Sequence, residues 1–313
     1  MSDSIAIVFP GQGSQSLGMS TALAEAFPQV RELYEEASDA LGLDLWKLVT
    51  EGPEEALNRT ENTQPAMLTA GVAAWRAWRE QGGNLPTVMA GHSLGEYSAL
   101  VAAQALDFSD AVKLVAARGR FMQEAVPAGT GAMAAILGLE DDQVRELCTR
   151  AAEGGVVEAV NFNSPGQVVI AGEKEAVERA MGLAKEAGAK RALPLPVSVP
   201  SHCALMEPAA QRLAEELARI EIRMPSVPVL HNVDVAEADS VEALREKLVQ
   251  QLHSPVRWVE TVQAMAGRGV EKIIEAGPGK VLTGLGRRID KNLQFLPVFD
   301  PASLEKALEV TNA

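Results

Sequence analysis

Short apolar runs alternate with longer helical segments along most of the chain. The run 5–9 predicts a buried strand that Pro10-Gly11 ends, and the run 87–90 predicts a second strand that Gly91 ends. Further strands are predicted at 228–233, 271–275 and 295–299, and helices at 20–27, 29–41, 65–79, from Gly91 to about 105 and at 109–125. This alternation indicates an α/β fold in which helices cover both faces of a parallel sheet.

The middle of the chain has a different order of elements. Strands are predicted at 132–139, 156–162, 167–171 and 191–198, with helices at 141–152 and 174–187. The order β-α-β-β-α-β is that of a ferredoxin-like unit. We therefore expect a ferredoxin-like subdomain at 128–198, inserted into a larger domain made of 1–127 and 199–313.

Charge and composition exclude several classes of function. The 313 residues include 28 Lys and Arg against 42 Asp and Glu, which gives a formal net charge of −14. A nucleic-acid binder needs a basic surface, and aromatic residues, at 4%, are too few for a base-stacking platform. With 47% hydrophobic and 22% charged residues, the chain has the composition of a packed globular protein.

The cysteines and histidines favour neither disulfides nor a metal. Cys148 and Cys203 are too few for a disulfide framework, so we expect two reduced thiols and a cytoplasmic location. The start of the chain lacks the features of a signal peptide, and no segment is apolar for long enough to span a membrane. The four histidines do not fall at metal-ligand spacing with the cysteines, so we expect no metal and no cofactor.

The strongest local motif is Gly91-His92-Ser93-Leu94-Gly95. It fits the G-x-S-x-G nucleophile elbow and lies between a predicted strand and a predicted helix, as that motif requires. Such a turn lifts the Ser93 hydroxyl above the sheet, and the helix start offers free N–H groups to an oxyanion. The alternative is a Gly/Ser turn that only caps a helix.

A serine nucleophile needs a base, and His202 is our candidate because it follows a predicted strand on a proline-fixed loop. His92 adjoins Ser93, but neighbouring side chains diverge on a tight turn. A structural histidine remains the alternative for His202. Gln12 directly follows the first strand, so it is predicted at the same sheet edge as Ser93. It is either an oxyanion donor or part of a plain glycine turn.

Arg118 is predicted on the apolar face of a helix. It follows Leu114 and Val115 by four and three positions, so the three share one face. A buried arginine usually has an anionic partner. That partner is either a carboxylate of the protein or a substrate, and periodicity alone slightly favours the first.

A set of motifs gives the chain a family resemblance. These motifs are Phe9-Pro10-Gly11-Gln12-Gly13-Ser14-Gln15, Thr63-Gln64-Pro65-Ala66, Gly91-His92-Ser93-Leu94-Gly95-Glu96-Tyr97, Arg118-Gly119, Gly131-Ala132-Met133, Asn161-Phe162-Asn163-Ser164-Pro165-Gly166-Gln167, Pro200-Ser201-His202 and Glu275-Ala276-Gly277-Pro278-Gly279. Over essentially its whole length the chain resembles the bacterial malonyl-CoA:acyl carrier protein transacylases of type II fatty-acid synthesis. The acyltransferase domains of polyketide synthases form the wider family. The resemblance implies an α/β-hydrolase-like large domain with a ferredoxin-like insertion.

The resemblance also assigns roles to residues. It makes Ser93 the nucleophile, His202 its base, and the backbone N–H groups of Leu94 and Gln12 the oxyanion hole. It makes Arg118 the ligand of the malonyl carboxylate.

Three further positions follow from the same motifs. Gln64 and Asn163 become substrate-binding residues. Gln251 becomes the residue whose backbone carbonyl orients the base, although the adjacent Gln250 leaves that position open by one residue.

The implied activity is malonyl transfer from malonyl-CoA to acyl carrier protein through a malonyl-serine intermediate, by an enzyme that we expect to be monomeric. A thioesterase or esterase with the same Ser/His pair is one alternative, and a silent carrier-protein scaffold is another. The family's carrier protein is acidic, so docking needs a local basic patch. The candidates are Lys190-Arg191 and a cluster of Arg287, Arg288 and Lys291, which Lys280 extends.

Overall fold

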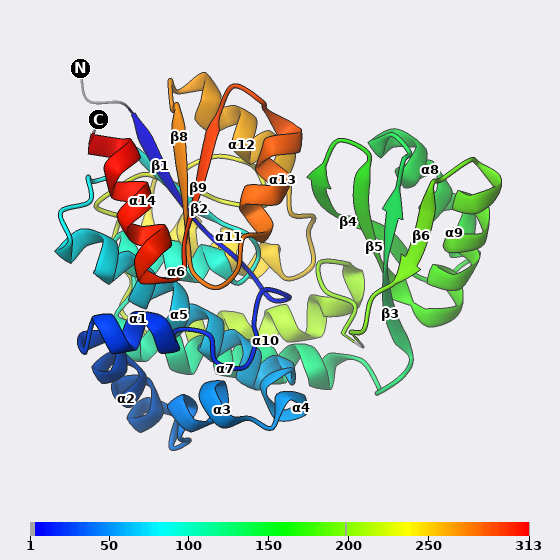
Figure 1. Cartoon of the computed structure of the whole chain (residues 1–313). Coiled ribbons are helices and arrows are strands. Elements are labelled where there is room, and N and C mark those ends of the chain that lie inside the picture. Colours follow the sequence, from blue (N-terminus) through cyan, green and yellow to red (C-terminus); the bar gives the residue numbers. More distant parts are fainter. Residues whose placement is uncertain (1–3, 198, 313) are drawn as a thin grey trace.

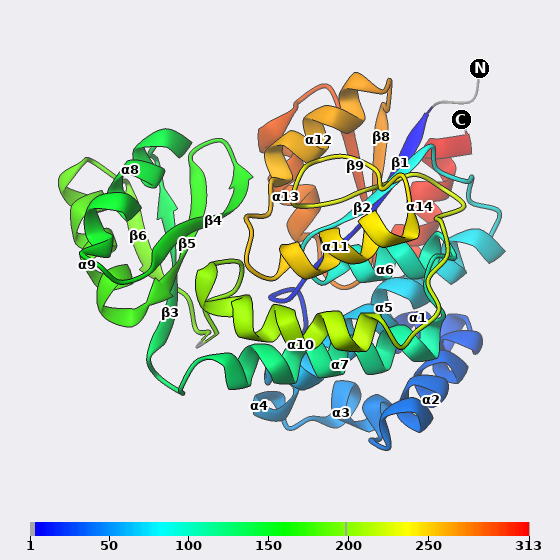
Figure 2. The ribbon, with the colours of Figure 1, turned by 180° about the vertical axis from the view of Figure 1, so that it is seen from behind.

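The computed structural model describes residues 4–197 and 199–312, and it contains two sheets. Figures 1 and 2 show a larger lobe that carries both ends of the chain and a smaller lobe built from the middle of the sequence. The predicted α/β class is confirmed, with a parallel sheet in the larger lobe and an antiparallel sheet in the smaller one. The exact boundaries of the two units, 127/128 and 198/199, stay a prediction.

The larger lobe has a five-stranded parallel sheet in the order β7-β2-β1-β8-β9. Its strands are β1 (Ile5–Phe9), β2 (Val88–Gly91), β7 (Val229–Leu230), β8 (Lys272–Ala276) and β9 (Gln294–Val298). Because side chains alternate along a strand, Ile5, Ile7 and Phe9 pack into one core cluster while Ala6 and Val8 pack into another. Helices therefore cover both faces, as predicted.

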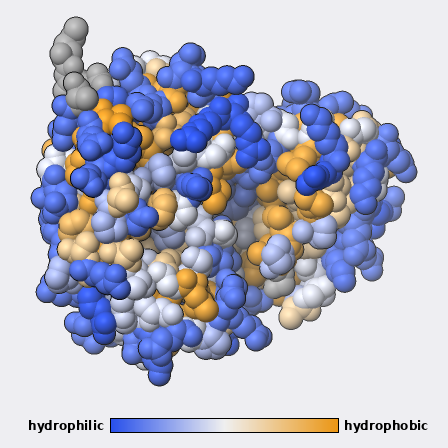
Figure 3. Space-filling model, in the orientation of Figure 1, coloured by the Kyte–Doolittle hydropathy of each residue, from blue (hydrophilic) through white to orange (hydrophobic). Residues whose placement is uncertain are grey.

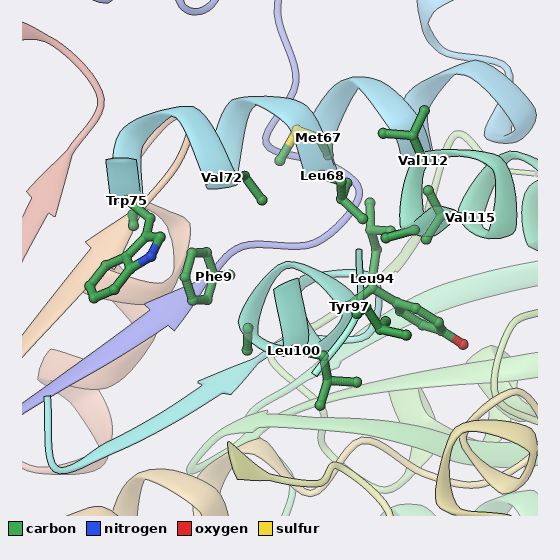
Figure 4. Packing of buried hydrophobic residues seen from close by; sticks show 14 of the residues in the cluster. Phe9, Met67, Leu68, Val72, Trp75, Leu94, Tyr97, Leu100, Val112 and Val115 are labelled. Carbon is green, nitrogen blue, oxygen red and sulfur yellow. The ribbon is translucent and has the colours of Figure 1, made fainter. Parts of the chain in front are cut away.

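Helices surround the sheet of the larger lobe. They are α1 (Thr21–Ala26), α2 (Gln29–Leu41), α3 (Leu45–Glu51), α4 (Glu54–Leu57), α5 (Thr60–Glu80), α6 (Gly95–Ala102), α7 (Phe108–Ala125), α10 (Glu207–Leu217), α11 (Val241–Gln251), α12 (Trp258–Gly267), α13 (Val281–Ile289) and α14 (Pro301–Asn312), with a short 3₁₀ turn, η1 (Ala204–Met206). In Figure 4, side chains of α5 meet Phe9 of β1 and the helix α6 that follows the Ser93 turn. Removing a side chain such as Phe9 from water contributes roughly 1.5–3 kcal/mol. Burial on this scale anchors the strands that position the site.

In the larger lobe, the predicted bounds of helices α5 and α6 are wrong. Helix α5 begins at Thr60, not at Pro65, because the N–H groups of Asn62 and Thr63 already donate to the Arg59 carbonyl. Pro65 lies inside the helix. Because proline has no N–H, the helix lacks the hydrogen bond that residue 65 would otherwise donate to the Glu61 carbonyl. Helix α6 ends at Ala102, earlier than predicted.

The strand predicted at 228–233 is shorter, since β7 is only Val229–Leu230. Its continuation is interrupted where the N–H of Asn232 turns to the side chain of Glu96 instead of a neighbouring strand.

The smaller lobe has a four-stranded antiparallel sheet in the order β4-β5-β3-β6. In chain order its elements are β3 (Gly131–Leu137), α8 (Asp141–Ala152), β4 (Val157–Ser164), β5 (Gln167–Glu173), α9 (Lys174–Glu186) and β6 (Arg191–Pro194). This is the predicted β-α-β-β-α-β order. Both helices pack on one face of the sheet, whereas Met133, Val160 and Val169 form a separate cluster on the other.

Strand β6 ends at Pro194, short of the predicted 191–198, and Ser198 lies outside the described residues. After the N–H of Leu195 donates to Met133, Pro196 has no N–H with which to continue the ladder. In the part of the chain that the structure describes, no helix has the length and apolar character needed to cross a membrane.

Candidate active site

Ser93 lies on a sharp turn between β2 and α6, at the carboxyl edge of the parallel sheet. Its φ of 51° lies in the left-handed region, which non-glycine residues rarely adopt. A Cβ at Gly91 would lie 1.8 Å from the carbonyl carbon of Gly95, and a Cβ at Gly95 would lie 2.0 Å from the Phe9 oxygen. The two glycines are therefore required by close backbone contacts, and the turn has the strand-turn-helix form of a nucleophile elbow.

The structure brings His202 to Ser93. The Ser93 Oγ lies 2.7 Å from His202 Nε2, and His202 Nδ1 donates to the Gln251 backbone carbonyl at 2.7 Å. That bond leaves Nε2 free to accept the serine proton. Burial, helped by the positive charge of Arg118, lowers the pKa of His202 to about 3, so the ring is neutral at physiological pH.

Gln251 connects the members of the site. Besides its carbonyl bond to His202, its side-chain amide accepts from Arg118 at 2.9 Å and donates to the Ser93 carbonyl at 3.1 Å. It is fully buried at the end of α11, whereas Gln250 is exposed. The geometry thus selects Gln251 over Gln250 as the residue that contacts the histidine.

Arg118 is a buried cation with neutral partners. Only 1% of the residue is exposed, and its guanidinium donates to Gln64 Oε1, Gln251 Oε1 and Ser93 Oγ at 2.8, 2.9 and 3.3 Å. The guanidinium carbon lies 5.4 Å from the centre of the Tyr97 ring, and the Nε–H has no acceptor in the described chain. Burial lowers the pKa of Arg118, yet an arginine side chain stays charged in proteins. Its acceptors among the described residues are therefore oxygens without formal charge, and the internal salt bridge that periodicity alone slightly favoured is not found there.

A cavity of about 130 Å³ opens above Ser93. This is roughly the volume of four water molecules in the liquid, which suits a small acyl group. One wall carries Ser93, His202 and Arg118, and we call it the catalytic wall. Three apolar residues of the lining, Met133, Leu195 and Val197, lie in the smaller lobe or shortly after its last strand, and we call them the apolar wall. Figure 3 shows the hollow between the two lobes, with hydrophobic residues along the smaller lobe.

Leu94 and Gln12, the predicted oxyanion donors, also line this cavity. Among the described residues, neither backbone N–H donates to an acceptor within the chain, whereas the Ser93 N–H donates to Asn232 Oδ1 at 2.7 Å. Two free donors beside the Ser93 hydroxyl are the arrangement that an oxyanion hole needs.

The other two predicted substrate-binding residues lie behind the cavity surface. Gln64 is buried and holds Arg118, while its amide nitrogen contacts the Met122 sulfur at 3.5 Å. Asn163 accepts from His92 Nε2 at 2.8 Å. In this structure both side chains therefore contact other site residues.

Three buried residues next to the Ser93 turn were not among the predicted site residues. They are Glu96, His231 and Asn232, which are joined to each other and to the Ser93 turn by hydrogen bonds. The predicted strand bounds concealed Asn232. The strand predicted at 228–233 includes it, but the observed β7 ends at Leu230, so Asn232 lies just past a strand end, at the sheet edge where α/β proteins bind ligands.

Comparison with known proteins identifies the family. Residues 6–294 match the family model of the acyl transferase domain. The chain is 60% identical over 305 residues to malonyl CoA-acyl carrier protein transacylase of Escherichia coli (strain K12), covering 97% of this chain and 99% of the relative. The transacylase structure from Coxiella burnetii superposes with a TM-score of 0.99 at 51% identity, covering 100% of this chain and 99% of that chain.

A second solved structure is described as a type II polyketide-synthase acyl-carrier protein in complex with its malonyl-transacylase. It matches with a TM-score of 0.97 and 60% identity, covering 98% of this chain and 99% of that chain. The chain therefore belongs to the acyl transferase family, among the malonyl CoA-acyl carrier protein transacylases.

Proposed function

We propose that this enzyme transfers the malonyl group from malonyl-CoA to the phosphopantetheine thiol of acyl carrier protein, in type II fatty-acid biosynthesis in the cytoplasm. The observation that carries the proposal is the Arg118 guanidinium, buried beside Ser93, whose acceptors among the described residues are all uncharged. The planar guanidinium can form two parallel hydrogen bonds with a carboxylate. A malonyl group provides that carboxylate, and an acetyl group would leave the buried charge unpaired.

The reaction has two halves with one intermediate. In the first, His202 Nε2 takes the Ser93 proton while Ser93 Oγ attacks the thioester carbonyl, and the Leu94 and Gln12 N–H groups stabilise the oxyanion. The C–S bond then breaks, and the CoA sulfur leaves as a thiol with the proton from His202. In the second half, the carrier thiol enters, gives its proton to His202 and takes the malonyl group, which restores the Ser93 hydroxyl.

His202 is oriented by the carbonyl of Gln251 rather than by a carboxylate. A carbonyl fixes the ring's tautomer and orientation without adding a negative charge to the cavity. We infer that this arrangement also avoids repulsion of the incoming malonyl carboxylate. Because no carboxylate is bonded to the His202 ring to raise its pKa, the arrangement also agrees with the strongly lowered pKa of His202.

Intact-protein mass spectrometry with malonyl-CoA, followed by purified holo acyl carrier protein, tests this function. We expect an adduct of malonyl mass on Ser93 that disappears when carrier protein is added, with malonyl-carrier protein as the product. Rapid release of free malonate without transfer would identify a thioesterase instead. A protein that forms no adduct and releases no malonate would be a scaffold.

A further inference from the structure

The backbone of the Ser93 turn is bridged by one side-chain amide. Asn232 Oδ1 accepts from the Ser93 N–H at 2.7 Å, and Asn232 Nδ2 donates to the Gly91 carbonyl at 2.7 Å. The bridge thus joins the two ends of the turn at which Ser93 adopts its left-handed φ of 51°. Because the Ser93 N–H can only donate and the Gly91 carbonyl can only accept, the orientation of the amide is defined.

Asn232 is itself held by a buried carboxylate. Glu96 Oε2 accepts from the Asn232 N–H at 2.9 Å, and Glu96 Oε1 accepts from His231 Nδ1 at 2.8 Å. Glu96, His231 and Asn232 are each 0% exposed. Leaving one of these buried polar groups without its partner is costly, so the whole arrangement is strongly constrained.

None of the three residues lines the cavity above Ser93. Their effect on the reaction must therefore act through the Ser93 turn and not through contact with the acyl group. The bridge also occupies the Ser93 N–H, which leaves the Leu94 N–H as the donor of this turn that can face an oxyanion.

We propose that Asn232 is a positioning residue that locks the Ser93 turn in its reactive geometry, and that Glu96 and His231 hold Asn232 in place from behind. The proposal rests on the proposed role of Ser93 as nucleophile. A small displacement of a nucleophile can lower a rate by about a hundredfold without changing which groups bind the substrate.

Two substitutions at one position test the bridge. Asn232→Ala removes both hydrogen bonds. Asn232→Asp keeps the shape and the acceptor for the Ser93 N–H, but an ionised carboxylate cannot donate to Gly91. When protonated, the introduced carboxyl group can again donate to Gly91 and accept from Ser93, so it reproduces the native pattern.

The rate constant of malonyl-Ser93 formation is measured by rapid quench and intact mass, over a range of malonyl-CoA concentrations. We expect Asn232→Ala to lower the maximal rate by about ten- to a hundredfold while the KM for malonyl-CoA stays within about twofold. We expect the loss in Asn232→Asp to be clearly smaller at about pH 5.5 than at about pH 8.5. Glu96 and His231 are bonded to this segment and couple to the introduced carboxyl group, so the pH dependence of Asn232→Asp relative to the parent reports the titration of these three groups together.

Asn62→Ala is the matched control. Asn62 also donates to a backbone carbonyl, that of Ala56 at 2.9 Å, and it does not line the cavity. Its rate should equal that of the parent. A folded Asn232→Ala with a parent-like rate, or with a loss that appears only in KM, would overturn the proposal. If Asn232→Ala does not fold, the Asn232→Asp profile decides, and a profile parallel to the parent's would overturn it.

The bridge can also be tested if the proposed function is wrong. If the parent forms no malonyl adduct, the rate of Ser93 labelling by a fluorophosphonate probe is compared across the same variants. Slower labelling in Asn232→Ala than in the parent and in Asn62→Ala would support the bridge. Equal labelling in all three would overturn it.

Discussion

The catalytic wall of the pocket differs from the apolar wall in how its side chains are held. Arg118 and His202 are each almost fully buried and have several defined hydrogen-bond partners, which converge on Gln251. Met133 and Leu195, on the apolar wall, pack in a small cluster on the open face of the antiparallel sheet. The two walls come from the two lobes that Figure 1 shows side by side.

This difference indicates that the two walls have different functions. Hydrogen bonds have preferred distances and angles, so a network of them fixes where a proton and a charge can lie. Apolar contacts lack that directionality and mainly exclude water and limit volume. We infer that the catalytic wall determines the chemistry and the malonyl carboxylate, whereas the apolar wall limits the size of the acyl group.

The largest effect is expected for the catalytic wall at Ser93. Ser93→Ala removes the one oxygen that accepts the acyl group, so neither the adduct nor transfer to carrier protein should be detectable by intact mass. Ser109→Ala is the matched control, because that hydroxyl bonds Glu36 on the outer surface. A malonyl adduct that persists in Ser93→Ala would show that the acceptor is another residue.

The next effect concerns which lobe receives the carrier protein. Arg287 and Arg288 are exposed in the last turn of α13, and Arg288 reaches Gln167 of the smaller lobe at 2.9 Å. Reversing both charges to glutamate should raise the KM for carrier protein about tenfold and leave malonyl-Ser93 formation nearly unchanged. The same reversal at Lys190 and Arg191 is the comparison, and an unchanged KM in both double variants would place docking elsewhere.

A smaller effect is expected on the apolar wall. Met133→Ala enlarges the cavity without removing a hydrogen bond of the site. We expect malonyl transfer to change by less than about tenfold, while a bulkier methylmalonyl group gains relative to malonyl. Competition between the two CoA thioesters, followed by mass spectrometry, measures the ratio. An equal change for both groups would mean that this wall does not limit size.

The smallest effect is that of pH on the first half-reaction. The base must be neutral to accept a proton, and burial lowers the pKa of His202 to about 3 from 6.5. Protonation of His202 should therefore not slow acylation between about pH 8 and 5, whereas an ordinary histidine would lose about thirtyfold by pH 5. A stopped-flow or quench profile that falls with a midpoint near 6.5 would contradict the buried, neutral base.

Much of the fold follows from local patterns. The strands β1, β2 and β8 are short, largely apolar runs that proline or glycine ends, so the sequence pattern predicts them closely. The errors arise where tertiary contacts decide. The early start of α5 depends on bonds around Arg59, and the short β7 depends on the bond between Asn232 and Glu96.

In the candidate site, too, local sequence patterns predict some features, and others depend on tertiary contacts. Ser93 lies in a local motif, and the periodicity around Arg118 predicts its buried face. That Arg118 has amide and hydroxyl acceptors and no carboxylate among the described residues is a property of the assembled structure, since Gln64 and Gln251 are far from it in sequence. The role of Asn232 could not be predicted from local sequence for the same reason, because it depends on a turn 139 residues away.

The central claim, that Arg118 recognises the free carboxylate of the acyl group, is tested most directly by comparing malonyl and acetyl transfer in Arg118→Ala. We measure the rate of Ser93 acylation from malonyl-CoA and from acetyl-CoA in variant and parent. Losing one partner of a buried pair costs roughly 3–5 kcal/mol, so malonyl transfer should fall more than about a hundredfold while acetyl transfer changes far less. Equal losses for both acyl groups would show that Arg118 supports the structure of the site and does not read the carboxylate.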